Sequence, residues 1–535
     1  PSRASIMTGL RPDRTGAYQY NSNFRDTMPW VYTLPQTLSE QGYFSTAIGK
    51  IYHVINGQND PLSWDEDWLS GSGIYGATGN APYENYAGSE GSLRDGAVTD
   101  AAVTKLAELK SQQPFFYGVG YVRPHLPFVA PSSYWDLYSI ADLEQPYTDS
   151  PAVNASSYAF TTWGELRSYS GIPASGPVSA VQEQNLIHGY YACVSFVDAQ
   201  VGRLMEALQE QGLSENTIVV VWGDHGYHLG DHGEWCKHTN FERATRIPLI
   251  VKVPWMPGAS RVDALVEALD IYPTLLELCG LEAPAHLQGE SLVPLLENPA
   301  AAGPAEAVSQ YPRNAESIMG YAMRTERYRY VEWRSAGSDT PADVELYDHF
   351  MDPGEDTNVV ASADAALLAS LSAQLSPYVG EAYRAQGSSE GTSFATYLLD
   401  AGMSGAAALI HADADGDGVD NLMEYALNLN PALPDGEPIE LGSGTAGLPA
   451  ADVAQWSNQG SFAVEYIRRK DADEIRYQIS FADTLTEPSW MEGSETSVTP
   501  IDANWERVRV ADPNANTTNT SRFGRLQVEL DSAGF

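Results

Sequence analysis

Residues 216–226 read NTIVVVWGDHG, a short apolar run that closes on a polar end. The run predicts a buried β-strand that ends on Asp224 and His225. Upstream, over residues 181–210, apolar side chains recur at the spacing of one helix face: Ile187, Tyr191, Val194, Val197, Val201, Leu204 and Leu208. In open α/β sheets, ligands gather at the carboxyl ends of strands. Asp224 and His225 are therefore candidates for chemistry.

The alternation of helix and strand patterns extends over about the first 310 residues and favours an α/β fold on a largely parallel sheet. Residues 98–112, VTDAAVTKLAELKSQ, predict an amphipathic helix, and PFFYGVGYV at 114–122 predicts the buried strand that follows. We take residues 1–315 as the first domain.

The pattern changes after residue 315. YAMRTERYRYVEWR at 321–334 predicts an alternating strand, and an Ala/Leu-rich stretch at 361–375 predicts a helix, so residues 316–385 are expected to form a small α+β subdomain. Residues 386–410 are rich in Gly, Ser and Ala and indicate a linker. Alternating strands such as FAVEYI and RLQVEL predict a separate β domain over 433–535.

Composition excludes several classes of protein. The chain has 535 residues with 70 acidic and 30 basic side chains, a formal charge of −40, which excludes nucleic acid as a partner. No apolar run reaches the length of about 18 residues that a membrane span needs. The three cysteines, Cys193, Cys236 and Cys279, are odd in number and widely spaced, so no disulfide framework is expected. We expect Cys193 and Cys279 to lie in the core, on helices.

Three polar clusters follow predicted strands or turns. The densest is GDHGYHLGDHGEWCKHTN at 223–240, where Asp224 and His225 can hold a divalent cation. The others are IGKIYH at 48–53 and YVRPHLPFVAP at 121–131. The alternatives are a solvated polar loop for the first and a structural His-Pro loop for the last. Together the clusters supply Lys, Arg and His donors around a metal, which suits a tetrahedral anion such as sulfate or phosphate.

These motifs resemble those of the sulfatase family, formylglycine-dependent enzymes of the alkaline-phosphatase superfamily, and most closely its iduronate-2-sulfatase-like members. PSRASIMTG at 1–9 is similar to the tail of the sulfatase signature, and GKIYH, RPHLPFVAP, DHGYHLGDHGEWCK and LQGESLVPLL resemble their counterparts. The resemblance covers roughly residues 1–385. It implies an alkaline-phosphatase-like sandwich with a mostly parallel central sheet flanked by helices, followed by a small α+β subdomain.

The resemblance also implies where the nucleophile lies. The formylglycine of sulfatases is made by a maturation enzyme from a Cys or Ser two positions before the residue that is Pro1 here. We therefore expect an N-terminally truncated chain, inactive by this mechanism as given, with a further pair of metal-binding aspartates upstream. A signal peptide is not seen in it.

The family's site residues carry over to positions in this sequence. Arg3 would hold the formylglycine and the metal-bound side of the sulfate, with Lys50 and His53 supporting the same group. His125 and Lys237 would contact the sulfate and the leaving oxygen, and one of them would donate the proton.

The metal and the sugar are assigned on the same ground. Asp224 and His225 would complete an active-site Ca²⁺ site. Arg123, Tyr227 and His228 are candidates for binding the sugar at the rim.

A second calcium motif lies outside the resemblance. DADGDGVDNLME at 413–424 sets Asp413, Asp415, Asp417, Val419 and Glu424 at positions 1, 3, 5, 7 and 12 of an EF-hand-like loop. The alternative is an acidic linker. We assign this loop to residues 411–432. Calcium at both sites suits a secreted or periplasmic protein.

The sequence therefore predicts hydrolysis of sulfate esters on a carbohydrate, a sulfated polysaccharide or its oligosaccharides. Two alternatives stay open: a phosphodiesterase or phosphonate hydrolase of the same superfamily, and a non-catalytic glycan-binding protein. Activity on sulfate against phosphate esters separates the first two. The residue two positions before Pro1 tests the third.

Overall fold

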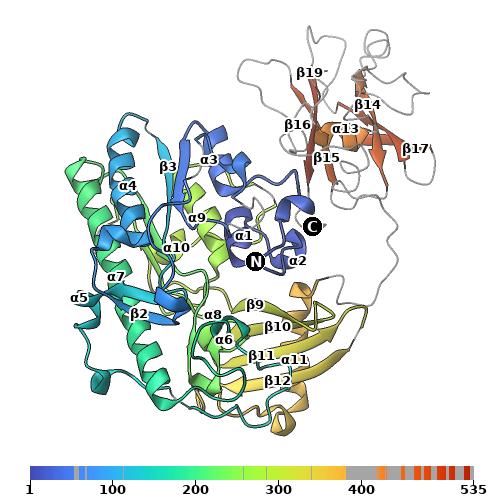
Figure 1. Cartoon of the computed structure of the whole chain (residues 1–535). Helices are drawn as coiled ribbons and strands as arrows, with labels where there is room; N and C mark the ends of the chain where they lie inside the picture. Colours follow the sequence, from blue (N-terminus) through green and yellow to red (C-terminus); the bar gives the residue numbers. More distant parts are fainter. Residues whose placement is uncertain are drawn as a thin grey trace, which may run out of the picture. The chain divides into compact units, whose positions relative to one another are not determined.

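The structure is a computed structural model that forms two units (Figure 1). Unit 1 comprises Pro1–Ser22, Thr33–Leu281 and Gly289–Gln386, and unit 2 comprises Asn23–Tyr32, Glu282–Gln288 and Gly387–Phe535. The described residues are 1–53, 59–66, 69–112, 114–146, 148–256, 258–284, 286–338, 340–380, 419, 421–427, 429, 448–451, 463–470, 475–482, 491–501, 505–512 and 523–530.

Unit 1 combines helices with paired strands ahead of its C-terminal sheet. The helices before the C-terminal sheet are α1 (Ser2–Thr8), α2 (Pro12–Thr15), α3 (Leu34–Glu40), α4 (Arg94–Leu109), α5 (Ser132–Trp135), α6 (Gly164–Arg167), α7 (Ala180–Glu210), α8 (Glu242–Thr245), α9 (Ile271–Leu278) and α10 (Val293–Glu297). The strands are β1 (Phe44–Gly49), β2 (Tyr83–Tyr86), β3 (Phe115–Gly120), β4 (Phe128–Pro131), β5 (Val219–Trp222), β6 (His228–Leu229), β7 (Trp235–Cys236) and β8 (Leu249–Lys252).

Strand pairing in this part of the described chain is mixed, and not largely parallel as the sequence led us to expect. β1 pairs with β3 and β2 with β4 in parallel, whereas β5 pairs with β8 and β6 with β7 in antiparallel register. β3 and β5 are half-buried along most of their length rather than fully buried as expected. β5 ends at Trp222, so Asp224 and His225 follow the strand by a turn.

The predicted helices over 98–112 and 181–210 are confirmed as α4 and α7, which appear in blue and green in Figure 1. Ser179 caps α7, because its hydroxyl accepts from the backbone nitrogen of Gln182. Leu106 of α4 packs with Ala207 and Leu208 of α7. One residue departs from the apolar helix face expected over 181–210: Val194 is 45% exposed.

A four-stranded antiparallel sheet, drawn in yellow in Figure 1, closes unit 1. Its order is β12-β11-β10-β9, with β9 (Glu306–Arg313), β10 (Ile318–Thr325), β11 (Tyr328–Ser335) and β12 (Pro341–Asp348). α11 (Ala365–Leu375) packs on it through Leu371 and Leu375. The single strand expected over 321–334 is wrong, since the chain reverses at Glu326 and Arg327 into a hairpin.

The three cysteines are free, as the sequence predicts. Cys193 is buried on α7, and Cys236 is buried in β7. Cys279 is half-buried at the C-terminal end of α9 rather than in the core.

Unit 2 contains one α-helix and two sheets among its described residues. These are α13 (Asn421–Leu427), a sheet of order β13-β14-β18-β17 and a sheet of order β16-β15-β19. The strands are β13 (Ala450–Ala451), β14 (Ala463–Arg469), β15 (Ile475–Ala482), β16 (Met491–Glu492), β17 (Ser494–Pro500), β18 (Trp505–Ala511) and β19 (Phe523–Leu530).

The EF-hand-like motif lies only partly in this description. Asp413, Asp415 and Asp417 lie outside the described residues. Val419 is buried, and Glu424 is one of the residues of helix α13. The loop stays a prediction. In the described part of the chain, no helix is long and apolar enough to cross a membrane.

Candidate active site

The polar clusters found in the sequence come together in unit 1. Lys50 and His53 follow β1, His125 follows β3, and Asp224 and His225 follow β5. Arg3 reaches the same region from α1, and Lys237 follows β7. Strand ends therefore supply most of the cluster, as the α/β topology predicts.

Two glycines bring the first strands into close register. The backbone nitrogen of Lys50 donates to the carbonyl oxygen of Gly120 at 2.8 Å. A β-carbon on Gly120 would lie 2.1 Å from the oxygen of Lys50, and Gly49 has a φ of +81°. Only glycine fits at either position, so the sequence fixes the path of the backbone that carries Lys50 and His53.

Arg3 joins the end of β5 to the turn after β1. Its Nε donates to Asp224 Oδ2 at 2.7 Å, and its Nη1 donates to the carbonyl oxygen of Ile51 at 2.8 Å. Burial alone would raise the pKa of Asp224, but the charges of Arg3, His225 and Lys50 hold it well below its usual range. Asp224 is therefore a carboxylate at any physiological pH.

His225 presents one free ring nitrogen beside this carboxylate. Its Nδ1 lies 2.7 Å from the carbonyl oxygen of Gly226, which can only accept, so Nδ1 carries the hydrogen. Nε2 is then a lone pair, 3.7 Å from Asp224 Oδ1. This arrangement of a carboxylate oxygen and an imidazole nitrogen fits a shared cation.

A second group joins Lys237, Glu165 and His125. Lys237 Nζ donates to Glu165 Oε2 at 2.7 Å, and His125 Nε2 lies 3.0 Å from Glu165 Oε1. Lys237 Nζ is also 3.4 Å from His125 Nε2. Burial would raise the pKa of Glu165, but Lys237 and His125 lower it to about 2. Glu165 lies on α6, outside every motif that the sequence offered, and no local signal marks it.

Positive charge dominates the space between the two groups. Burial, and then the charge of Arg3, lower the pKa of Lys50 to about 7. Burial and the charges of Lys50 and Arg3 lower the pKa of His53 to about 4. The buried Nδ1 of His53 has no hydrogen-bond partner among the described residues. Crowded basic groups whose pKa values are lowered in this way favour a bound anion, which would raise them again.

Two of the three residues expected at the rim lie in the interior instead. Arg123 is 6% exposed, and its guanidinium donates to the carbonyl oxygens of Tyr75, His125 and Val129. His228 is fully buried, with Nε2 2.7 Å from the hydroxyl of Thr239. These side chains hold the loops that carry His125 and Lys237 and do not lie at a sugar-facing rim.

Tyr227 is the third residue that departs from the rim assignment. Its ring packs edge-on to Phe128 at 5.9 Å, and its hydroxyl donates to Cys236 Sγ at 3.6 Å. The ring is partly buried and packs against the core cluster that contains Phe128 and Cys236.

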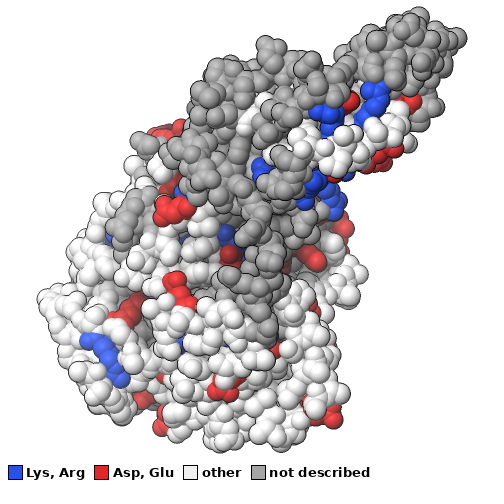
Figure 2. All heavy atoms as spheres, turned by 90° about the vertical axis from the view of Figure 1, so that its right-hand side faces the viewer, with Lys and Arg blue, Asp and Glu red and all other residues white. Residues whose placement is uncertain are grey.

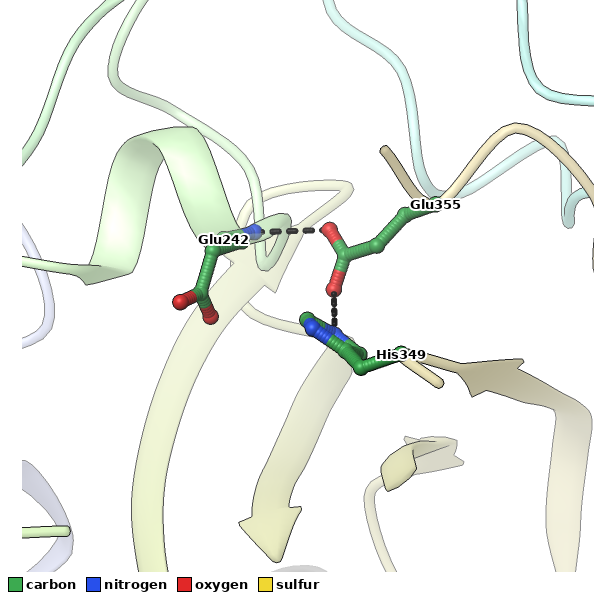
Figure 3. Close-up of side chains that lie close together, drawn as sticks. All are labelled: Glu242, His349 and Glu355. Carbon is green, nitrogen blue, oxygen red and sulfur yellow. Dashed lines mark hydrogen bonds and ion pairs between the residues drawn. The ribbon is translucent and has the colours of Figure 1, made fainter. Parts of the chain in front are cut away.

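A different group has the spacing of a metal site. Glu242, His349 and Glu355 bring one ligand atom each within 4.8 Å (Figure 3). Glu355 Oε1 lies 2.9 Å from His349 Nε2, and Oε2 accepts from the backbone nitrogen of Glu242 at 2.7 Å.

Arginines already neutralise these carboxylates. The Arg329 side chain, 2% exposed, pairs with Glu355 at 2.5 Å and with Glu242, and Arg324 lies 3.6 Å from Glu242. A divalent cation would meet two guanidinium groups at this place. The group is therefore a buried ion-pair network that links α8 to the C-terminal sheet.

The cationic site contrasts with the rest of the surface. On the face drawn in Figure 2, acidic side chains are scattered over the described residues rather than gathered in one patch. In a chain of net charge −40, the basic side chains Arg3, Lys50 and Lys237 gather at one site, beside the carboxylates Asp224 and Glu165. Such a concentration of basic groups in an acidic chain attracts an anionic substrate.

Comparison with known proteins decides the family. The sulfatase family profile matches residues 1–281, and the profile of the N-sulphoglucosamine sulphohydrolase C-terminal region matches residues 230–379. The chain belongs to the sulfatase family. The predicted membership is confirmed, and with it the activity class of a sulfuric ester hydrolase.

Curated relatives agree with the family assignment. A sulfatase of Formosa agariphila is 32% identical over 381 residues, which span 66% of this chain and 72% of that protein. Iduronate 2-sulfatase of Homo sapiens is 31% identical over 451 residues, which span 67% of this chain and 82% of that protein.

Solved structures agree on the fold alone. A structure in complex with its substrate D-glucosamine-2-N,6-O-disulfate has a TM-score of 0.56 at 23% identity and covers 71% of this chain and 89% of its own. The phosphonate monoester hydrolase of Agrobacterium radiobacter has a TM-score of 0.56 at 22% identity, covering 71% and 87%. The fold is the alkaline-phosphatase-like α/β fold of the sulfatases, as predicted.

Proposed function

We propose that this sulfatase hydrolyses sulfate esters on a carbohydrate, a sulfated polysaccharide or its oligosaccharides. One observation carries the proposal: Arg3, Lys50 and Lys237 converge beside Asp224 and His225 at the ends of β1, β5 and β7. The curated relatives named iduronate 2-sulfatase and the fold neighbour solved with a disulfated glucosamine support a sugar sulfate as the substrate.

The proposed site uses calcium and a formylglycine that comes from a Cys or Ser upstream of Pro1, converted by a maturation enzyme. Calcium binds ligands at about 2.3–2.6 Å, so one ion could contact both Asp224 Oδ1 and His225 Nε2. Their separation of 3.7 Å and the free lone pair on Nε2 support this fit. When bound, these groups supply the nucleophilic oxygen and polarise the sulfate.

The chain's own residues bind and orient the sulfate in this proposal. Arg3 holds Asp224 through Nε, and Lys50 and His53 support the sulfate oxygens. His125 and Lys237 face the bridging ester oxygen. Because that oxygen gains negative charge as its bond to sulfur breaks, a proton from this side accelerates the step.

Further parts of the proposal concern the whole protein. The loop at 413–424 binds a second Ca²⁺ through Asp413, Asp415, Asp417, Val419 and Glu424, and the protein is secreted or periplasmic, where calcium is available. The domains divide at 1–315, 316–385, 386–410, 411–432 and 433–535. The C-terminal sheet does include β9 from Glu306, which precedes the proposed division at 316.

The test is ester selectivity of the protein expressed from its whole gene. We expect release of sulfate from 2-O- or 6-O-sulfated sugars, loss of that activity with a chelator and recovery with Ca²⁺. Faster release of phosphate or phosphonate from matched esters would favour the phosphonate hydrolase alternative. No turnover of any ester, with sulfated glycan still bound, would favour a glycan-binding protein.

A further inference from the structure

Glu165 is a carboxylate inside the proposed active site that no motif contains. It comes from α6, and its two oxygens contact two different predicted catalytic residues. Oε2 accepts from Lys237 Nζ at 2.7 Å, and Oε1 lies 3.0 Å from His125 Nε2. The three side chains are similarly shielded, with exposed fractions of 20% for Glu165, 17% for Lys237 and 21% for His125.

The hydrogen atoms of this group can be deduced from its neighbours. His125 Nδ1 lies 2.8 Å from the carbonyl oxygen of Leu126, so Nδ1 carries a hydrogen. In the neutral ring, Nε2 is then a bare lone pair that accepts from Lys237 at 3.4 Å. Glu165 Oε1 is buried and has no hydrogen-bond donor among the described residues. In that state two lone pairs face each other at 3.0 Å.

A proton on Nε2 removes this conflict. It turns the contact with Oε1 into a charge-assisted hydrogen bond and satisfies a buried carboxylate oxygen that otherwise has no donor. Lys237 keeps its stronger contact, with Oε2. The geometry thus offers one defined place for a proton between His125 and Glu165.

We propose that Glu165 is a positioning residue: it fixes Lys237 through Oε2 and stabilises a proton on His125 Nε2 through Oε1. His125, rather than Lys237, then delivers the proton to the leaving group. This inference rests on the proposed sulfatase reaction. It decides between the two donors that the sequence left open.

The proton balance is simple. As the bond between sulfur and the ester oxygen breaks and sulfur bonds to the incoming nucleophile, the proton on Nε2 moves to the ester oxygen. The sugar leaves as an alcohol. The ring of His125 becomes neutral, and Nε2 again accepts from Lys237.

The surroundings of His125 make Glu165 decisive for this proton. Burial, and then the charges of Lys237 and Lys50, lower the pKa of His125 to about 3, so the ring is neutral before sulfate binds. The Tyr75 hydroxyl, 3.3 Å from Nδ1, is the other titratable group in contact. Of the charged groups that act on His125, Glu165 is the one whose charge favours the protonated ring.

The experiment compares Glu165→Gln with the matched variant Glu234→Gln in the protein expressed from its whole gene. Glutamine keeps an acceptor for Lys237 but cannot stabilise an imidazolium. Glu234 is a nearby carboxylate, more deeply buried at 4% exposed, which accepts from Thr161 and is not paired with His125 or Lys237. Each variant is assayed with a sugar sulfate, whose alcohol is a poor leaving group, and with 4-nitrophenyl sulfate, whose phenolate leaves without a proton.

We expect Glu165→Gln to lower kcat for the sugar sulfate by about tenfold or more, while kcat for 4-nitrophenyl sulfate stays within about threefold of the wild type. The reason is that general acid catalysis contributes a rate factor of about 10²–10⁴ only where the leaving group needs a proton. The falling limb of its pH profile should move to lower pH. Glu234→Gln should affect both substrates alike.

A binding measurement gives a second readout. Calorimetry of inorganic sulfate binding in buffers of different ionisation enthalpy counts the protons taken up. The wild type should take up more than Glu165→Gln at mildly acidic pH.

Three outcomes would overturn the inference. Equal losses for both substrates would reduce Glu165 to a structural role. Unchanged rates for both, or equal proton uptake, would remove it from the reaction. A wild type that releases sulfate from neither substrate would instead overturn the proposed function, on which this inference rests.

Discussion

Buried charges in this molecule are stable where a partner of opposite sign lies within contact distance. Glu355 shows the principle outside the active site, because Arg329 and His349 contact the same oxygen at 2.5 and 2.9 Å. Burial would raise the pKa of Glu355, but these partners lower it from 4.5 to about 2. The folded state therefore binds this proton less readily than the unfolded chain does.

The first prediction concerns acid stability. The contribution of Glu355 is fully present above pH 4.5 and is lost as the pH falls toward about 2. Glu355→Gln should lower the free energy of unfolding at neutral pH by about 3–5 kcal/mol, because it leaves Arg329 buried without its partner. Chemical denaturation at neutral pH and below pH 4.5 measures both effects.

The control is Glu326→Gln, at the exposed turn of the β10–β11 hairpin. It should change the free energy of unfolding by less than about 0.5 kcal/mol at either pH. If acidification lowered the free energy of unfolding equally in the wild type and in Glu355→Gln, the role given to Glu355 in the ion-pair network would be wrong. A calcium-dependent stabilisation that Glu355→Gln abolishes would show a metal site there after all.

Among the elements, β1 and β3 determine where Lys50 and His53 lie. Their parallel register sets Gly49 opposite Gly120, and the oxygen of Lys50 approaches Gly120 too closely for any side chain. The position of Lys50 therefore depends on the pairing of β1 with β3, and not on the following loop alone.

The second prediction tests this strand pairing with two nearby glycines of β3. Gly120→Ala should destabilise the fold by about 1–3 kcal/mol and weaken sulfate binding, because its β-carbon would overlap backbone. Gly118→Ala is the matched control, since its β-carbon would lie 3.1 Å from the mobile end of Ile51. Denaturation and calorimetry compare the two. If Gly120→Ala and Gly118→Ala changed the sulfate affinity equally, the pairing of β1 with β3 would not be what positions Lys50.

Local sequence patterns predicted the elements well where one period runs through the whole segment. α4 and α7 follow from apolar residues at helical spacing, although Val194 faces solvent. The β10–β11 hairpin was missed because Glu326 and Arg327 carry no Gly, Pro or Asn turn signal.

The site was only partly predictable for a similar reason. Strand ends and motifs located Lys50, His125 and Asp224, and the structure brings them together. Glu165 could not be predicted from the sequence because it is 72 positions from Lys237 in the chain and lies in no motif. Arg123 was assigned to the rim because a motif gives residue types but not burial.

At the scale of the whole molecule, a strongly acidic chain carries a cationic site in unit 1 and a predicted calcium loop in unit 2. The two calcium sites are proposed to do different work, one in catalysis and one in local stability. Their effects should therefore be separable by mutation.

The third prediction separates them. Replacing Asp413 and Glu424 by Ala should make the chain around 411–430 cleave faster in limited proteolysis with Ca²⁺ present, while sulfate release persists. Asp435→Ala, an acidic residue just outside the motif, is the control. Identical cleavage of the wild type with Ca²⁺ and with a chelator would contradict a calcium-binding loop.

The most direct measurement is the rate of sulfate against phosphate release from matched sugar esters, for the wild type and for Lys237→Ala and His125→Ala, expressed from the whole gene. We expect preferred sulfate release by the wild type, and a loss of sulfate-release rate of about 10² or more in each variant, with the fold intact by circular dichroism. Preferred phosphate release, or near-normal sulfate release by both variants, would contradict it.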